Sequence, residues 1–204
     1  MFKNLIIIFF LFNLFSCGKN ADEKTIEAIL SANIALGTSD CQTAIDILEA
    51  NGRVNKNAAY LKTLASAYAC RAGYSTVTFF TSDFVKTATP APFGGTTRYS
   101  TSSAAVASTL QNDSSYRDLQ TAINILLYAG GIDSNLDPTA AERAKHFSTS
   151  EAADINSQLL YMVLVQLGRY GYFYGDSSTA TGKKGSGPGT NTCFTSYVSA
   201  ITPV

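Results

Sequence analysis

The sequence predicts an all-α protein built from antiparallel helical hairpins. Three observations indicate this fold class. Apolar residues recur at spacings of three and four along most of the chain, which is typical of one face of a helix. Residues that commonly begin and end helices bracket these segments, with Asp40 and Ser148 at starts and Gly52 and Gly73 at ends. A stretch rich in Ser, Thr, Pro and Gly, residues 87–115, separates two helical parts.

The first 16 residues have the plan of a cleaved export signal. Lys3 supplies a positive charge, and the apolar run 5–12 follows it. This run is too short to cross a bilayer, because a transmembrane helix needs about 20 apolar residues. We therefore expect residues 1–16 to be a signal peptide.

The signal ends in residues that resemble the lipobox of bacterial lipoproteins. Leu14 and Ser16 lie three and one residues before Cys17, whereas Phe15 departs from the small or β-branched residue usual there. The resemblance implies that Cys17 is acylated and becomes the first residue, and several acyl chains give stable anchoring. Gly18 in place of Asp implies the outer membrane, facing the periplasm or the cell surface. An ordinary secretory signal is the alternative.

The net charge and the length of the chain limit which partners and how many domains we expect. The chain has 15 Lys and Arg against 15 Asp and Glu, and loss of Lys3 leaves a net charge of about −1 with no basic stripe. Nucleic acid is therefore not an expected partner. Without its signal the chain keeps 188 residues, enough for one substantial domain or two small ones.

After a tether at 17–22, residues 23–86 are predicted to form helical hairpins. Helices are expected at 22–36, between Asp40 and Gly52, and at 57–72 and 74–86. Their expected inward faces consist of Ile26, Ile29, Leu30 and Ile34; Cys41, Ala44, Ile45 and Leu48; Leu61, Leu64, Ala65 and Tyr68; and Val77, Phe80 and Phe84.

The sequence of these helices contains a weak internal repeat. Ala32 and Ala65 are 33 residues apart, and Gly73 and Tyr74 restart the pattern. This internal repeat resembles the tetratricopeptide repeat, in which small residues let paired helices approach closely. The likeness covers residues 25–84 and lacks the usual Pro, so that Asn55 to Asn57 must turn the chain. A plain antiparallel helical bundle is the alternative.

The tetratricopeptide resemblance implies a disulfide between Cys41 and Cys70. In such repeats the start of one second helix lies beside the end of the next first helix, where these cysteines fall. Closing a loop of this size contributes about 3 kcal/mol in the chain-entropy model. Two buried thiols are the alternative, and metal ligation is not expected, because no CxxC or histidine pair accompanies them. Cys193 is left over as a free thiol, an intermolecular link or half of a pair completed outside this chain.

The predicted second helical half spans residues 116–175. A helix is expected at 115–129, Pro138 is expected in the first turn of another, and Ser148 with Glu151 forms a capping-box pattern before a long helix. The long helix is apolar on several sides and is expected at the centre of this half's core. The apolar residues of the first and the long helix are Leu119, Ile123, Leu126 and Leu127, and Ile155, Leu159, Leu160, Met162, Val163 and Leu167.

An aromatic cluster punctuated by glycines, 168–175, follows the long helix. With Tyr68, its rings form a candidate binding surface, since aromatic side chains are common at interfaces. Rings that merely cover the helix end are the alternative. Residues 176–204 are expected to be a flexible Gly-rich loop and C-terminal segment; the loop lacks the residue order and preceding strand of a phosphate-binding loop. The cluster's aromatic residues are Tyr170, Tyr172, Phe173 and Tyr174.

Catalytic patterns are scarce. The single histidine, His146, has no partner histidine or nucleophile motif nearby, and Cys193 has no assigned base. We expect no enzyme activity, no cofactor and no metal. The expected function is a membrane-anchored helical scaffold that binds a protein partner in the cell envelope. The alternative is a small-ligand accessory component of a periplasmic transport system, which would show a closed apolar pocket lined by Tyr68, Phe80 and the long helix.

Overall fold

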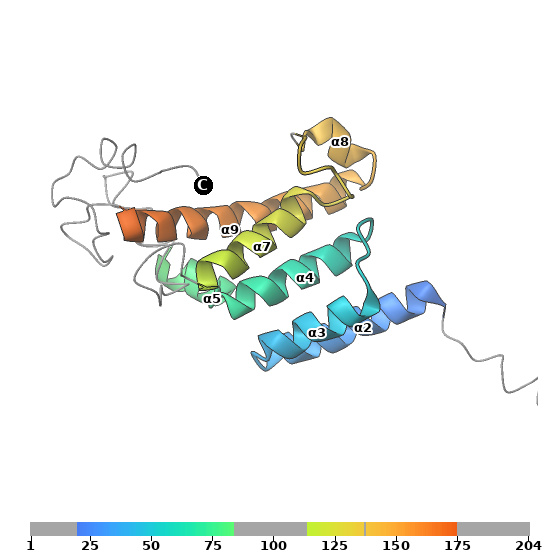
Figure 1. Ribbon diagram of the computed structural model, residues 1–204, viewed down its shortest axis with the longest axis horizontal. Helices are drawn as coiled ribbons and strands as arrows, with labels where there is room; N and C mark the ends of the chain where they lie inside the picture. Colours follow the sequence, from blue (N-terminus) through green and yellow to red (C-terminus); the bar gives the residue numbers. More distant parts are fainter. Residues whose placement is uncertain (1–19, 84–113, 137, 175–204) are drawn as a thin grey trace, which may run out of the picture.

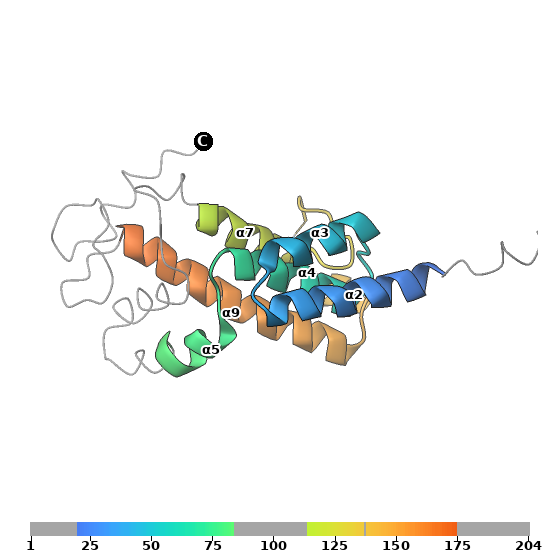
Figure 2. The ribbon, with the colours of Figure 1, turned by 90° about the horizontal axis from the view of Figure 1, so that it is seen from below.

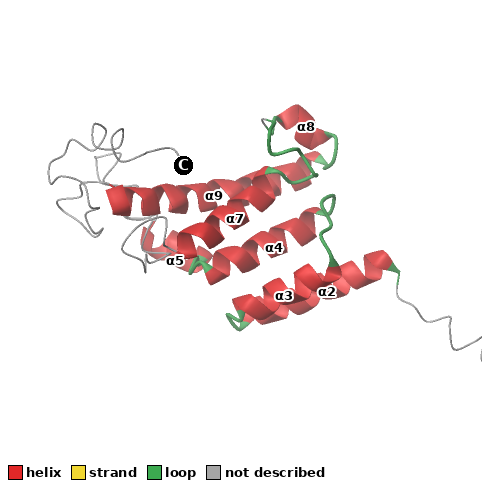
Figure 3. Ribbon diagram, in the orientation of Figure 1, coloured by secondary structure: helices red, strands yellow, loops and turns green. Residues whose placement is uncertain are grey.

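The computed structural model describes residues 20–83, 114–136 and 138–174. In this part of the chain the regular structure is helical and includes no strand, which confirms the all-α fold (Figure 3). The elements are α2 (Ala21–Gly37), α3 (Cys41–Asn51), α4 (Ala58–Arg71), α5 (Thr76–Thr78), the π-helical turn η1 (Phe79–Asp83), α7 (Ser114–Leu127), α8 (Ala140–Ala144) and α9 (Thr149–Tyr174). The predicted signal, Cys17, Phe84, the insertion up to residue 113, and residues 176–204 lie outside the described residues.

The helices stack in chain order as antiparallel neighbours. α2 packs on α3, α3 on α4, α4 on α7 and α7 on α9, and both α2 and α9 also contact α4 (Figures 1 and 2). α4 is therefore the central helix, and eight of its 14 residues are buried. Its predicted inward residues Leu61, Leu64 and Ala65 are fully buried, while Tyr68 is half-buried.

Local signals in the sequence set the helix ends. The Asp40 side chain accepts the Thr43 amide at 3.2 Å to begin α3, which ends at Gly52 with a φ of 83°. The predicted capping box before α9 is confirmed, because the Ser148 amide donates to Glu151 at 2.9 Å and the Glu151 amide donates to the Ser148 hydroxyl at 3.3 Å.

The short helix α8 carries the buried cation Arg143. Its N-cap is Thr139, so Pro138 precedes the helix and does not lie in its first turn as predicted. Arg143 is buried and donates to the carbonyls of Leu126 at 3.2 Å and Leu127 at 2.9 Å. These carbonyls belong to the last turn of α7, where a cation also complements the helix dipole. Burial lowers the pKa of Arg143.

The predicted inward face of α2 is wrong for three of its four residues. Ile26, Leu30 and Ile34 are 55%, 59% and 73% exposed, and only Ile29 is half-buried. Helix α2 instead packs through small side chains, which let its backbone approach α3 and α4 closely. The residues that it buries are Thr25, Ala28, Ala32 and Ala35.

α7 follows its prediction, with Leu119, Ile123 and Leu126 buried. α9 is not the all-round core helix that the sequence predicts. It buries one face on α4 and α7, and it leaves another apolar face partly exposed, at the edge of a hollow that it shares with α7. Ile155, Met162 and Val165 are buried on the first face, and Leu160, Val163 and Leu167 are about half exposed on the second.

The segment predicted as a helix from 74 to 86 is divided between α5 and η1. Val77 and Phe80 were expected inside, but they are 72% and 43% exposed. Phe79 is fully buried in their place, and its ring packs against those of Tyr74 and Tyr161. The Phe79 and Tyr161 ring centroids are 5.6 Å apart.

Candidate functional site

An open groove of about 670 Å³ runs across α2, α4 and α9. These helices come from different parts of the stack, and α4 lies between the other two (Figure 2). Most of the lining residues carry hydroxyl or amide groups, with one lysine and one aspartate, but apolar atoms contribute more of the lining surface than polar atoms do. The groove residues are Asn33, Leu36, Ser39, Lys62, Thr63, Ser66, Cys70, Tyr74, Ser75, Thr76, Asp154, Ser157, Gln158 and Tyr161.

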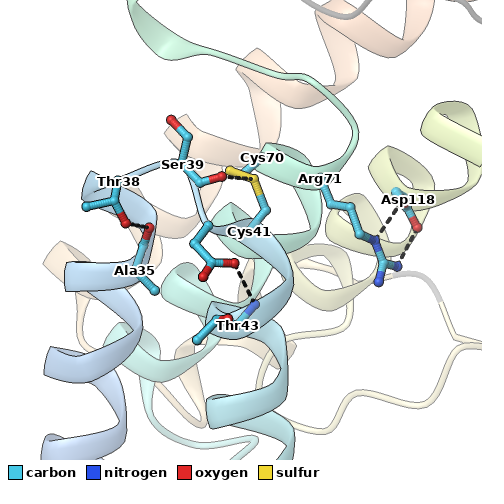
Figure 4. The surroundings of a disulfide bond; sticks show 9 residues. Ala35, Thr38, Ser39, Cys41, Thr43, Cys70, Arg71 and Asp118 are labelled. Carbon is cyan, nitrogen blue, oxygen red and sulfur yellow. Dashed lines mark hydrogen bonds and ion pairs between the residues drawn. A yellow bond between two sulfur atoms is a disulfide. The ribbon is translucent and has the colours of Figure 1, made fainter.

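A disulfide fixes one side of the groove. Cys41 at the start of α3 is bonded to Cys70 at the end of α4, with Cα atoms 5.6 Å apart, a separation typical of disulfides (Figure 4). The pairing confirms the prediction. Since Cys70 lines the groove, the bond holds this wall to the neighbouring α3.

The residue after Cys70 ties the same end of α4 to α7 and a second time to α3. The Arg71 guanidinium donates to both Asp118 oxygens of α7, at 2.9 and 2.6 Å (Figure 4). It also donates to Gln42 of α3 at 2.8 Å. This hydrogen bonding with Asp118 raises the pKa of Arg71. Bidentate pairs of this kind are geometrically specific. α3, α4 and α7 are thereby joined at one end of the groove.

Tyr68 belongs to this cluster and does not line the groove. The Arg71 guanidinium carbon lies 5.1 Å from the centroid of its ring, and the Tyr68 hydroxyl donates to Glu49 at 3.4 Å. Burial and the nearby Glu49 carboxylate raise the pKa of Tyr68. The candidate binding residue predicted on α4 thus links α3 to α4.

Polar contacts between α4 and α9 cross the middle of the groove. The Lys62 ammonium lies 3.0 Å from Asp154, and the Gln158 amide donates to the Ser66 hydroxyl at 2.8 Å and to the Lys62 carbonyl at 3.2 Å. The Asp154 side chain is 62% exposed, so water screens the ion pair and its contribution to stability is small. These contacts set the spacing between the two helices and leave the polar groups accessible from the groove.

Aromatic rings form one end of the groove. The ring centroids of Phe80 and Tyr161 are 5.1 Å apart. The rings are arranged edge to face, an arrangement that aromatic pairs prefer. Tyr74 lies close by, with its centroid 6.4 Å from that of Phe79. Burial raises the pKa of Tyr74, while a hydrogen bond with Thr76 opposes the shift. The groove therefore combines hydroxyl and amide side chains with the rings of Tyr74 and Tyr161.

The other chemically distinctive residues lie away from the groove. His146 follows α8, is half-buried, and lies so close to Gly130 that a Cβ there would approach its ring to 2.8 Å. Among the described residues, no group of three His, Cys, Asp or Glu side chains could hold a metal. None of the described helices combines the length and the apolar character needed to cross a membrane.

Several predicted site residues lie outside the part of the chain that is described. They include Cys17, Cys193 and the side chains of residues 168–174, although the backbone of α9 extends through this aromatic segment to Tyr174. The sequence prediction thus treated a continuation of the helix as a separate cluster. The candidate binding residues concerned are Tyr170, Tyr172, Phe173 and Tyr174.

Sequence reasoning missed the residues that define the groove. Lys62 and Asp154 are 92 residues apart, so their contact could not be predicted without the packing of α4 on α9. One signal was available, because Asp154, Gln158 and Tyr161 recur at helical spacing along the long helix. That stripe marks the groove side of α9.

Comparison with known proteins yields no relative. No family model matches the chain, and neither a curated protein nor a solved structure matches it. The groove and the exposed apolar faces are therefore the observations from which function is inferred.

Proposed function

We propose that this chain is a lipid-anchored helical scaffold of the bacterial cell envelope that binds a protein partner in the groove. One observation carries the proposal: the groove is open, and three helices from successive parts of the stack line it. Stacked helical hairpins that present one helix each to a shared surface resemble tetratricopeptide-like arrays, which recognise peptides or proteins. Such recognition needs no catalytic group.

The open shape of the groove favours a peptide over a compact small molecule. Small-ligand sites enclose most of the ligand, whereas this groove is open along its length. This groove offers hydroxyl and amide groups along its length, and Tyr74 and Tyr161 at one end. A peptide backbone can use the polar groups, and an apolar side chain can contact the rings. Tyr68, which a closed small-ligand pocket was expected to include, does not line the groove.

The anchor is proposed from the lipobox resemblance at Cys17. Intact-mass measurement of protein from the membrane fraction tests it directly. We expect a mass that lacks residues 1–16 and includes acyl chains. An unacylated mass that begins elsewhere contradicts the anchor.

Site-specific crosslinking tests the groove. A photoreactive amino acid at Ser66, in the middle of the groove, should give a crosslinked protein of discrete mass in cells, and the same residue at Thr43 on α3 should not. Thr43 is exposed and does not line the groove, so it is a matched control. A groove-filling Ser157→Trp change should abolish the crosslink from position 66. Equal crosslinking from both positions contradicts the proposal.

A further inference from the structure

The face of α2 that points away from the stack carries an unpartnered apolar ridge. Ile26, Leu30 and Ile34 recur every four residues, so they lie along one side of the helix, and each is more than half exposed. We call these three residues the α2 ridge. The opposite face of the same helix buries mainly alanines. Large aliphatic side chains that are lined up in solvent while small ones are buried indicate a surface with a second contact.

We propose that the α2 ridge rests on the lipid surface of the membrane, so that α2 lies in the interface. The inference rests on the proposed acylation of Cys17. Three residues lie between Cys17 and Ala21, where α2 begins, and the four Cα-to-Cα steps of this chain span at most about 14 Å. The lipid surface is therefore always within this distance of the start of α2. With α2 lying flat, about 25 Å of helix places all three ridge residues at the interface.

The size of the ridge favours lipid over a protein partner. A stable protein interface buries about 800 Å² per partner, and three partly exposed aliphatic side chains fall well short of that area. A membrane contact needs less intrinsic affinity here, because the anchor already holds α2 at high effective concentration beside the bilayer. Amphipathic helices bind membranes in this orientation, with the apolar face in the headgroup boundary.

The charges around the ridge specify the kind of lipid surface. Asp22, Glu23 and Glu27 are exposed on α2, against the single cation Lys24. An anionic surface repels this balance, so zwitterionic headgroups are the fitting partner. The contact also orients the groove, because α2 contributes Asn33 to its lining. The groove then opens beside the membrane, where the partner of an envelope scaffold would be met.

Tryptophan fluorescence tests the contact, because the chain has no tryptophan of its own. The full acylated protein carrying Leu30→Trp is reconstituted into phosphatidylcholine vesicles that contain brominated lipid. Leu136→Trp is the control: Leu136 is 56% exposed, against 59% for Leu30, and it belongs to the segment between α7 and α8. That segment lies on the far side of the stack from α2 (Figure 1). We expect the Leu30→Trp protein to shift its emission to shorter wavelength and lose most of its fluorescence, and the control to do neither. Replacing part of the phosphatidylcholine by anionic lipid should weaken the quenching.

The other outcomes overturn the inference in separable ways. If the acylated protein floats with the vesicles but the Leu30→Trp emission is not quenched, the ridge contact is wrong and the anchor stands. A blue shift without bromine quenching that grows with protein density shows that a second copy covers the ridge. An intact mass without acyl chains overturns the anchor itself, and this inference with it.

Discussion

α2 and α7 occupy similar places in the stack, one on each side of the α3–α4 region, yet they bury opposite kinds of residue. α7 directs Leu119, Ile123 and Leu126 into the core. α2 buries Ala28, Ala32 and Ala35 with Thr25 and turns its large aliphatic residues to solvent. The first helix is held by close approach of small side chains, and the second by burial of large ones.

The two modes of packing differ in free energy. Burying a Leu or Ile side chain stabilises a fold by about 1.5 to 3 kcal/mol, and an alanine contributes much less. The α2 side of the stack has a covalent reinforcement that the described part of the α7 side does not: the disulfide that fixes α3, on which α2 packs, to α4. The disulfide offsets the smaller stabilisation that the buried alanines of α2 provide. The aliphatic residues of α2 are then available to contact another surface.

The strongest test compares leucines from the two helices. Leu126→Ala removes a fully buried side chain and should lower the free energy of unfolding by about 2 to 5 kcal/mol. Leu30→Ala, on the exposed ridge, should change it by no more than about 0.5 kcal/mol in detergent-free, membrane-free solution. Denaturant unfolding of the two variants measures the difference. A large cost for Leu30→Ala would mean that the α2 ridge is buried within the protein.

The disulfide carries the next largest effect. Replacing both Cys41 and Cys70 by Ser should lower the free energy of unfolding by about 3 kcal/mol, because the unfolded chain regains the freedom of the closed loop. Hydrogen exchange should rise in α2 and α3 before it rises in α7. Adding reductant should destabilise the wild type by a similar amount and leave the double variant unchanged. Equal exchange in α3 and α7 would contradict the role assigned to the disulfide.

Enlarging an alanine tests the close approach of α2. Ala32 is fully buried, so Ala32→Leu should overpack the interface and cost about 1 to 3 kcal/mol of unfolding free energy. Ala21→Leu is the matched control, because Ala21 is exposed at the start of the same helix. Thermal or denaturant unfolding compares them. If Ala32→Leu is neutral, α2 has room beside its neighbours and the small residues are not what sets the packing distance.

The comparison of α2 with α7 also shows which parts of the fold can be predicted from the sequence. The ends of α3 and the start of α9 followed from capping residues, whereas the helix expected at 74–86 did not form as one element. The stripe of α7 was assigned correctly because its large apolar residues share one face. On α2 two faces competed, one of aliphatic residues and one of alanines, and periodicity does not say which face meets the protein. The disulfide was predicted from the resemblance to the tetratricopeptide repeat, and the bond itself is present. The groove did not, because contacts such as Lys62 with Asp154 depend on tertiary packing across 92 residues.

The smallest predicted effect concerns the aromatic end of the groove at alkaline pH. Burial raises the pKa of Tyr74 above its ordinary 10.0. Between that value and the raised pKa, the unfolded chain loses the phenolic proton while the folded protein keeps it, so the free energy of unfolding falls as pH rises. Tyr74→Phe keeps the ring and removes this titration, and it should flatten the decline.

Urea unfolding at several pH values from about 8 to about 11 measures both slopes for Tyr74→Phe. A residual slope is expected, because burial also raises the pKa of Tyr60 and Tyr68 near the α3–α4 contact. Identical slopes in the wild type and the variant would mean that the Tyr74 hydroxyl stays accessible to water in the folded state. The aromatic end of the groove would then be a looser structure than the disulfide-bonded end of α4, and a partner could enter the groove from the side of Tyr74.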